Sequence, residues 1–489
     1  MRTILKKIGF LAVVSLLFLV IASINPGTAK AYAWTQVNAD GFGDASNATL
    51  VSLTNFGNYI YATSGNVAGV KVFRSSDGTS WSQVGSSGFG DVNNVEGVSI
   101  VFNNALYIFT QNVVTGLEIW KSTDGENYLQ IGTDGLGDSA NELAVGCVVF
   151  QDYLYFGTSN SATGTEVYRM NSGDSPVQVN TAGFGDANNI ETWSMDVFSG
   201  YLYAGTSKVA TGAEIWRSSN GTDWAQVNTD GFDDANNLRI STMFHLGNYV
   251  YAGTLNAATG AEIWRSSNGT DWAQVNTDGF GDADNYWAGD TTAIINNIIF
   301  VGIRNNTSGA ALYTSINGTD WTQEGSAGFG DANNFGAYAA TFDGYVYFGF
   351  SNNTTGAEIW RSESLAELSF LTTSLPNGIV GSFYNNGIGI SSGTYPYSFS
   401  VSGNLPPGLS ISSDGVISGT PTTNGLYSFI ISVSDAGNPT QIASRGFTIL
   451  ILSSLPAAGI DSNWIYISVL MVLSLLSTYA SVRLIYKKV

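Results

Sequence analysis

The stretch Trp272–Asn285, WAQVNTDGFGDADN, decides the fold, because nearly the same letters, WAQVNTDGFDDANN, occupy Trp224–Asn237. An aromatic residue or proline recurs at the equivalent position at intervals of 47, 47, 48, 48, 48 and 49 residues. The seven positions are Trp34, Trp81, Tyr128, Pro176, Trp224, Trp272 and Trp321. Self-similarity at a nearly fixed period indicates a repeat architecture.

Each copy of the repeat contains four segments that are typical of short strands. The copy that begins at Asn188 reads NNIETWSMDVFSG, YLYAGTSKVATG, AEIWRSSNGTD and WAQVN, and the loop TDGFDDANN follows. The segments are rich in apolar, aromatic and β-branched residues, and Asn-Gly or Asp-Gly supplies the positive φ of a tight hairpin. No helical periodicity interrupts them. The sequence therefore predicts an all-β chain with a seven-bladed β-propeller over residues 34–364.

The phase of the repeat predicts how the ring closes. Residues 34–38, WTQVN, form a fourth strand without the preceding three, and Ala357–Ser364, AEIWRSES, end the last copy after its third strand. Pairing of these two ends completes the seventh blade and leaves no open edge.

The hairpins Ser75–Trp81, SSDGTSW, and Ser218–Trp224, SSNGTDW, resemble the Asp-box of sialidase-type propellers and are one residue shorter. In that family the box is a structural turn on the outer part of a blade, so the resemblance implies a fold and no chemistry. Such an enzyme also needs an arginine cluster, and only Arg239 and Arg304 lie outside repeat positions of the propeller. The arginines at one shared repeat position, which we expect to be structural, are Arg74, Arg169, Arg217, Arg265 and Arg361. Sialidase activity is therefore not expected.

A second module is expected over residues 368–452, where the repeat has ended. The segment Leu405–Asp435, LPPGLSISSDGVISGTPTTNGLYSFIISVSD, resembles the Ig-like module of bacterial surface proteins, which is related to cadherin-like domains. The resemblance implies a β-sandwich that acts as a spacer. Cadherin-like relatives often bind calcium between tandem modules. Only one copy is present here, so the resemblance does not imply a calcium site in this module.

Residues 1–33 read as a secretory signal peptide, with a basic start, an apolar run and small residues near the end. Cleavage is expected after Ala31 or Ala33, and the alternative is an uncleaved membrane anchor. Both alternatives predict that the following chain is exported.

The C-terminal end predicts a single-pass membrane anchor. Residues 464–482 are 19 uncharged residues, which as a helix span about 28 Å, enough to cross a bilayer. Residues 483–489 form a short basic cytoplasmic tail. The linker 453–463 contains LPAAG, with Leu455, Pro456 and Gly459 matching the LPxTG signal of sortase-attached wall proteins. Ala458 replaces the threonine at the cleaved bond, so both wall attachment and membrane retention remain open.

Composition excludes several functional classes. Lys+Arg 18 against Asp+Glu 38 gives a net charge of −20, which argues against a nucleic-acid partner. The single cysteine, Cys147, excludes an internal disulfide and is expected to be a buried small hydrophobe. The single histidine, His245, is expected to be structural, and no nucleotide-binding or metalloprotease motif is present. No cofactor is expected.

An aspartate recurs in the loop of every copy. These residues are Asp44, Asp91, Asp138, Asp186, Asp234, Asp282 and Asp331. We expect each to accept backbone N–H groups in the blade-to-blade turn, with the preceding Phe or Leu packed between blades. The alternative is a calcium loop, although the spacing is not that of an EF-hand.

Function is expected where the copies differ, directly after the Asn-Asn pair, at the mouth of the channel. The candidate ligand residues are Glu96, Glu142, Glu191, Trp193, Arg239, Tyr286, Trp287, Asp290, Phe335 and Tyr338. Aromatic rings that stack on sugars and acids that bind hydroxyls predict a cell-surface binding or adhesion protein for carbohydrate, another surface polymer or a protein. One alternative is a surface glycoside hydrolase or polysaccharide lyase that uses these carboxylates. A second alternative is a structural surface-layer component.

Overall fold

A computed structural model describes residues 32–172, 175–365, 367–392, 397–435 and 441–453. The chain divides between Glu367 and Leu368 into two compact units. The expected signal peptide, except for Tyr32 and Ala33, lies outside the described residues, as do the LPAAG motif, the membrane span and the tail. Among the residues that are described, no helix has the length and apolarity needed to cross a membrane.

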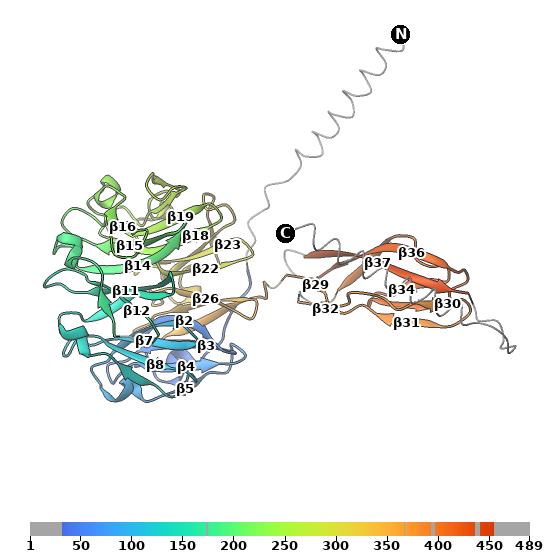
Figure 1. Cartoon of the computed structure of the whole chain (residues 1–489), viewed down its shortest axis with the longest axis horizontal. Coiled ribbons are helices and arrows are strands. Elements are labelled where there is room, and N and C mark those ends of the chain that lie inside the picture. The colour runs from blue at the N-terminus through green and yellow to red at the C-terminus, as the bar shows by residue number, and fades with distance from the viewer. Residues whose placement is uncertain (1–31, 173–174, 366, 393–396, 436–440, 454–489) are drawn as a thin grey trace, which may run out of the picture. The chain divides into compact units, whose positions relative to one another are not determined.

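The first unit consists, over its described residues, of seven four-stranded antiparallel sheets (Figure 1). Blade 1 contains β2 (Thr49–Phe56), β3 (Tyr59–Gly65), β4 (Lys71–Ser75) and β5 (Ser82–Val84). Blade 2 contains β6 (Glu96–Phe102), β7 (Ala105–Gln111), β8 (Glu118–Ser122) and β9 (Leu129–Ile131). Blade 3 contains β10 (Leu143–Phe150), β11 (Tyr153–Ser159), β12 (Val167–Met170) and β13 (Val177–Gln178). Blade 4 contains β14 (Glu191–Phe198), β15 (Tyr201–Ser207), β16 (Ile215–Ser218) and β17 (Ala225–Gln226).

The remaining three blades repeat this order. Blade 5 contains β18 (Arg239–Leu246), β19 (Tyr249–Leu255), β20 (Ile263–Ser266) and β21 (Ala273–Gln274). Blade 6 contains β22 (Trp287–Ile295), β23 (Ile298–Arg304), β24 (Ala311–Ser315) and β25 (Thr322–Glu324). Blade 7 contains β26 (Tyr338–Phe342), β27 (Tyr345–Phe350), β28 (Glu358–Ser362) and β1 (Trp34–Gln36). The first strands of successive blades are neighbours around the ring, and β26 returns to β2. This is a β-propeller.

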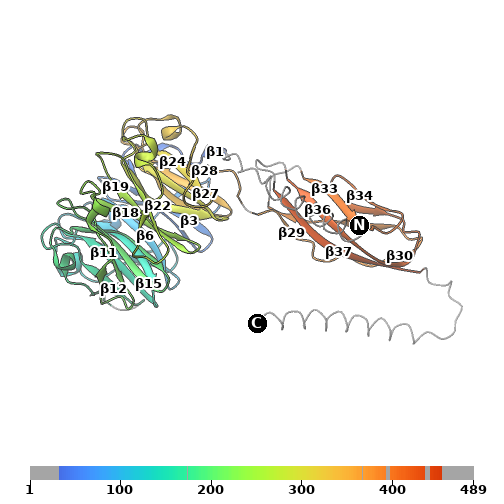
Figure 2. The same cartoon turned by 90° about the horizontal axis from the view of Figure 1, so that it is seen from above.

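The N-terminal strand closes the ring. β1 pairs antiparallel with β28, with Trp34 opposite Ser362 and Gln36 opposite Trp360 (Figure 2). Backbone hydrogen bonds from Val37 N to Ile359 O and from Glu363 N to Ala33 O extend this pairing at both ends. Blade 7 is therefore built from both ends of the repeat region.

Two contacts recur between neighbouring blades. The Trp272 indole Nε1 donates to the carbonyl of Val227 in the outer strand of the preceding blade, at 3.2 Å. The hydroxyl of Tyr203 lies against Gly269 in the hairpin of the following blade, where a Cβ would come within 1.8 Å of it. Tyr203 itself is fully buried. The repeated Trp and the hairpin Gly therefore serve packing between blades.

The loop that closes the opening stretch is a tight turn in every copy. The seven turns are η1 (Asp40–Gly43), η2 (Ser87–Gly90), η3 (Asp134–Gly137), η4 (Ala182–Gly185), η5 (Asp230–Asp233), η6 (Asp278–Gly281) and η7 (Ala327–Gly330). In η6, Gly279 has φ +54 and lies so close to Gly260 that a Cβ on Gly260 would be 2.5 Å from the Cα of Gly279. Phe280 also has positive φ, at 58°. Its ring stacks on Tyr313 of the next blade at 4.1 Å.

The recurring aspartate is bound by the turn, as expected. Asp282 Oδ1 accepts the backbone N–H of Asp284 at 3.0 Å, and Oδ2 accepts the side-chain amide of Asn305 at 3.3 Å. The equivalent Asp331 accepts from Asn333 and Asn352 in the same way. Among the described residues, no three His, Cys, Asp or Glu side chains are grouped as metal ligands. The expected backbone hydrogen bond to this aspartate is therefore present in these turns.

The second unit is an Ig-like β-sandwich. One sheet has the order β30-β37-β36-β33 and faces the sheet β31-β35-β34, and β29 pairs with β32. The strands are β29 (Ser369–Phe370), β30 (Gly378–Ile379), β31 (Tyr384–Gly387), β32 (Ile390–Ser391), β33 (Ser398–Gly403), β34 (Leu409–Ile411), β35 (Val416–Gly419), β36 (Gly425–Ser434) and β37 (Ile442–Leu452). The core between the sheets includes Ile417, Phe429, Ile431, Phe447 and Ile449.

Candidate ligand site at the mouth of the channel

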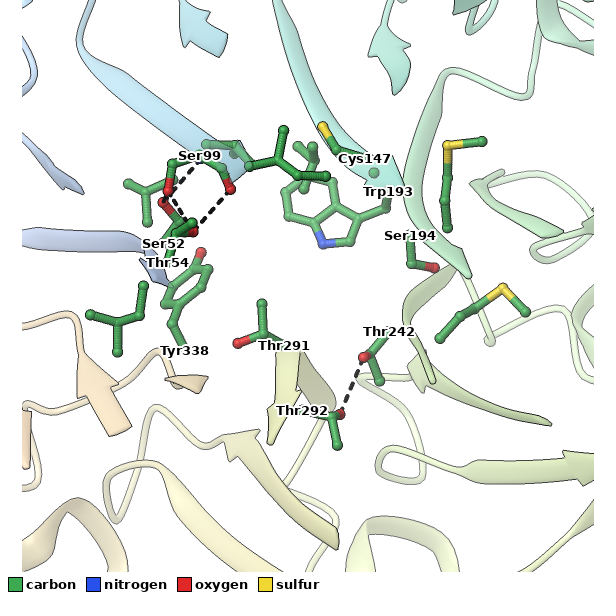
Figure 3. Close-up of a pocket in the computed structure, with 18 of the residues that line it drawn as sticks. Ser52, Thr54, Ser99, Cys147, Trp193, Ser194, Thr242, Thr291, Thr292 and Tyr338 are labelled. Atoms are coloured by element: carbon green, nitrogen blue, oxygen red, sulfur yellow. Dashed lines mark hydrogen bonds between the residues drawn. The ribbon is translucent and has the colours of Figure 1, made fainter. Parts of the chain in front are cut away.

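A cavity of about 260 Å³ lies on the axis of the propeller, between the first strands. Its wall carries hydroxyl groups of Ser and Thr and the side chains of Cys147 and two methionines (Figure 3). Trp193 of blade 4 and Tyr338 of blade 7 reach into it from opposing sides. Burial raises the pKa of the Cys147 thiol, which disfavours the thiolate. Cys147 is half-buried and lines the cavity, whereas the sequence predicted a buried side chain.

Arginine and tryptophan side chains form a stacked cluster where the first strands begin. The guanidinium of Arg239 lies 3.8 Å from the centre of the Trp193 ring and 4.6 Å from that of Trp287. The two indoles meet edge to face, with their centres 5.4 Å apart. Cation–π contacts of this kind are worth about 0.5–2 kcal/mol each. Three residues predicted from separate blades therefore meet at one place.

Arg304, which was not among the predicted ligand residues, completes this cluster. Its guanidinium lies 3.9 Å from the centre of the Trp287 ring, and its NH2 group donates to the Tyr338 hydroxyl at 3.3 Å. Arg304 ends β23 and is paired with Trp287, the first residue of β22. The signal that could have found it was already in the sequence, because Arg304 is one of the two propeller arginines outside repeat positions.

Glu191 and Ser207 fix the orientation of Arg239. The Arg239 guanidinium forms an ion pair with Glu191, and its Nε donates to Ser207 Oγ at 2.6 Å. Both charged side chains are 16% exposed, so water screens this pair only in part. A charge-assisted pair of this kind holds the guanidinium plane in one orientation. We call Glu191, Trp193, Arg239, Trp287, Arg304 and Tyr338 the mouth cluster.

Two indole N–H groups of the mouth cluster have no acceptor. Trp193 Nε1 and Trp287 Nε1 are both shielded from solvent and have no hydrogen-bond partner in the described part of the chain. A buried donor without an acceptor costs about 1–3 kcal/mol.

The tryptophans do not offer the open stacking platform expected from the sequence. Trp287 is only 8% exposed. The guanidiniums of Arg239 and Arg304 both lie over its ring. Stacking of a sugar on Trp287 is therefore obstructed in this arrangement, and the chemistry that the mouth cluster presents is that of stacked cations.

The other predicted residues lie elsewhere on the ring. Glu96 accepts a hydrogen bond from Thr49 at 3.3 Å, and the backbone of Glu142 bonds Asn112 and Ser159. Tyr286 accepts a bond from Asn306 at 3.0 Å, in a separate shallow hollow. Phe335 precedes β26. The side chain of Asp290 is outside what the structure describes.

His245 and the repeat arginines contact neighbouring side chains of the propeller. His245 is near the end of β18, whereas Arg239 begins it, so the histidine lies at the other end of the strand. Its Nδ1 lies 3.0 Å from Asp196, and this hydrogen bond raises the pKa of the imidazole. The repeat arginines stack on tyrosines, for example Arg265 at 4.2 Å from the Tyr249 ring centre.

Comparison with known proteins supports the assignment of the second unit as an Ig-like domain. The family described as "Putative Ig domain" matches residues 362–451. No curated protein matches the chain. The family match covers the Ig-like unit and leaves the propeller to be assigned from its strand pairing.

Solved structures resemble the chain only distantly. A lectin from Burkholderia pseudomallei is 10% identical, with a TM-score of 0.49, over 69% of this chain and 97% of the lectin. The endosialidase of phage phi92 is 12% identical, with a TM-score of 0.40, over 81% of this chain and 75% of that one. A protein described as a putative alpha-galactosidase from Bacteroides fragilis is 23% identical, with a TM-score of 0.16, and the match spans 17% of each chain. At these TM-scores the likenesses carry no functional inference.

Proposed function

We propose that this protein is exported and displayed at the cell surface, where the mouth cluster binds an anionic group on a carbohydrate polymer. The observation that carries the proposal is the meeting of Arg239 and Arg304 on two tryptophans at the channel mouth. They are the propeller's two arginines outside repeat positions, and they come together from blades 5 and 6.

The chemistry of the cluster favours a carboxylate, sulfate or phosphate over a neutral sugar. Guanidinium groups bind such anions through paired N–H donors, and pre-organisation lowers the entropy cost of binding. The chain has a net charge of −20, so two neighbouring cations mark this face as a local exception.

Surface display is supported by the order of the sequence segments. The predicted signal peptide precedes the propeller, and the Ig-like unit lies between the propeller and the predicted membrane span. The span is expected to anchor the chain, and the Ig-like unit is expected to serve as a spacer.

Binding is tested with residues 32–453 and a set of polysaccharides that includes uronic-acid, sulfated and neutral polymers. Arg304→Gln is expected to weaken binding of the acidic polymers by tenfold or more, equivalent to about 1.4 kcal/mol. The matched control is Arg265→Gln, because Arg265 is also stacked on an aromatic ring but occupies a repeat position. Equal binding of neutral and acidic polymers, or equal effects of the two variants, would contradict the proposal.

The same samples are assayed for released product, because a hydrolase or lyase would degrade the polymer. Glu191 forms an ion pair with Arg239 and is the carboxylate of the mouth cluster that this alternative would use. Product release that disappears in Glu191→Gln would favour the enzyme alternative.

A further inference from the structure

The segment before β1 is bound to the propeller by Tyr32. The Tyr32 ring lies 5.3 Å from the ring of Phe300 in β23. The backbone nitrogen of Tyr32 donates to Glu324 Oε2 at 3.1 Å. The chain is thus held at a defined position two residues before the first strand.

Glu324 is an unusual residue for its place in the repeat. The equivalent residues of the other copies are all apolar: Val37, Val84, Ile131, Val179, Val227 and Val275. Glu324 is nevertheless 1% exposed, and it also accepts a hydrogen bond from the Thr314 hydroxyl at 2.9 Å. Burial of a carboxylate costs several kcal/mol unless a positive charge or several donors compensate. The acid replaces valine in the copy that contacts Tyr32.

A second acid, Glu363, also lies near Tyr32. Glu363 follows β28 in blade 7, where the other copies have Ser, Thr, Asn or Ile. Burial, then the charge of Glu324, then that of Glu363 raise the pKa of the Tyr32 phenol to about 12. The surroundings of Tyr32 are therefore negative, which favours a cation at its nitrogen.

We propose that Tyr32 is the first residue of the mature protein and that its α-ammonium group forms an ion pair with buried Glu324. Hydrolysis of the Ala31–Tyr32 peptide bond by a signal peptidase consumes one water. Ala31 leaves as a carboxylate, and the Tyr32 nitrogen becomes an amine that takes up a proton. The cation is thereby generated 3.1 Å from Glu324, where the precursor has only a neutral amide.

This assignment separates the two cleavage positions that the sequence leaves open. Cleavage after Ala33 would remove Tyr32, its contact with Phe300 and its hydrogen bond to Glu324. Cleavage after Ala31 retains both contacts and strengthens the second. The inference depends on export of the chain and is independent of the proposed ligand.

The first experiment is measurement of the N-terminus of the full chain after export from a bacterial host. Intact mass and N-terminal sequencing are expected to give Tyr32. A chain that begins at Trp34, or that retains residues 1–31, would overturn the assignment. This result does not depend on ligand binding, so it distinguishes failure of this inference from failure of the proposed function.

The second experiment compares the melting temperatures of full chains in detergent that begin at Tyr32 or at Ala31. The two forms carry the same charges, but in the longer form the ammonium is displaced by one residue. The Tyr32 form is expected to melt at least about 2 °C higher at pH 7. Glu324→Gln is expected to abolish this difference in melting temperature. Glu324→Val, which places there the valine found in most other copies, is expected to do the same.

The pH dependence gives a further check. The α-amino group has an ordinary pKa of about 8, and an ion pair raises it in the folded state. While Glu324 stays ionised, the stabilisation is therefore complete below pH 8 and is lost as the pH rises through the higher folded value. Equal melting temperatures of the two forms at pH 7, or a difference that persists in Glu324→Gln, would overturn the ion pair.

Discussion

At the scale of single residues, the hairpin glycine Gly269 and the glycine Gly281 of turn η6 separate backbone strain from steric overlap. Gly269 has φ +76, and a Cβ there would come within 1.8 Å of the Tyr203 hydroxyl, whereas Gly281 has φ +92 and open space around it. Gly281→Ala is expected to cost about 1–2 kcal/mol for backbone strain alone. Gly269→Ala is expected to cost about 1–3 kcal/mol more, because the inserted methyl displaces a buried tyrosine. Denaturant unfolding measures both, and equal costs would contradict the packing argument.

Lys208 is a second residue with a distinct role. It is 6% exposed, and its Nζ lies 2.5 Å from Glu214, 3.0 Å from Asp186 and 3.2 Å from Asp230. Burial lowers the pKa of the Lys208 ammonium, but the bonds to these carboxylates outweigh it and the net shift is upward. Six other copies place Asn here: Asn66, Asn112, Asn160, Asn256, Asn305 and Asn352.

Lys208→Asn is therefore expected to destabilise the propeller at neutral pH by about 1 kcal/mol, because Asp186 and Asp230 lose their cation. Buried Glu214 keeps its bonds from Asn189 and Trp216, as Glu262 keeps the equivalent bonds beside Asn256. The pKa of Asp186 is lowered by its bond to the Asn188 backbone and then by Lys208, and the pKa of Asp230 is also lowered. Such stabilisation is present above the ordinary carboxyl pKa of about 4 and is lost as the pH falls through the folded values. The difference between the wild type and Lys208→Asn should thus shrink between pH 5 and pH 3. Urea unfolding across this range measures it, and a constant difference would refute the account.

At the scale of strands and turns, the sequence predicted most of what the structure contains. Segments rich in apolar, aromatic and β-branched residues, together with Asn-Gly or Asp-Gly hairpins, predicted four strands in each copy, because these signals are local. The turn after the fourth strand was predicted only as a loop. Its left-handed backbone at Phe280 depends on the contact of Gly260 with Gly279 and on stacking against Tyr313, both of which join distant parts of the sequence.

The closing strand β1 can be tested at this scale. Val37 N and Ala33 O bond to β28, so the Thr35 N–H also faces β28, since residues two apart share an orientation. Thr35→Pro is expected to cost about 3 kcal/mol or more, because it removes a ladder hydrogen bond at the closure. Thr35→Ala is the control and should stay within about 0.5 kcal/mol, because the Thr35 side chain is exposed. Similar melting temperatures for the two variants would argue against closure through β1.

At the scale of the whole molecule, the ring decides which residues meet. The sequence predicted that divergence after the Asn-Asn pair marks the channel mouth, but the order of copies gives no distances across the ring. Glu191, Trp193, Arg239, Trp287 and Tyr338 meet because blades 4 to 7 are consecutive and their first strands share one axis. Arg304 was missed because it reaches the same place from the end of a second strand.

Trp193→Val gives the most direct test of whether the mouth cluster serves binding or packing. Blades 1 to 3 have Val51, Val98 and Val145 at this position, and the fold accommodates valine there. The substitution removes a shielded indole N–H that has no acceptor in the described chain, together with one cation–π contact of Arg239. Removal of the unpaired N–H stabilises the fold and loss of the cation–π contact destabilises it. Each effect on the free energy of unfolding is about 0.5–3 kcal/mol, so stability should change little. Affinity for an acidic polysaccharide should fall by tenfold or more, and a large loss of stability with unchanged affinity would show that Trp193 only closes the channel.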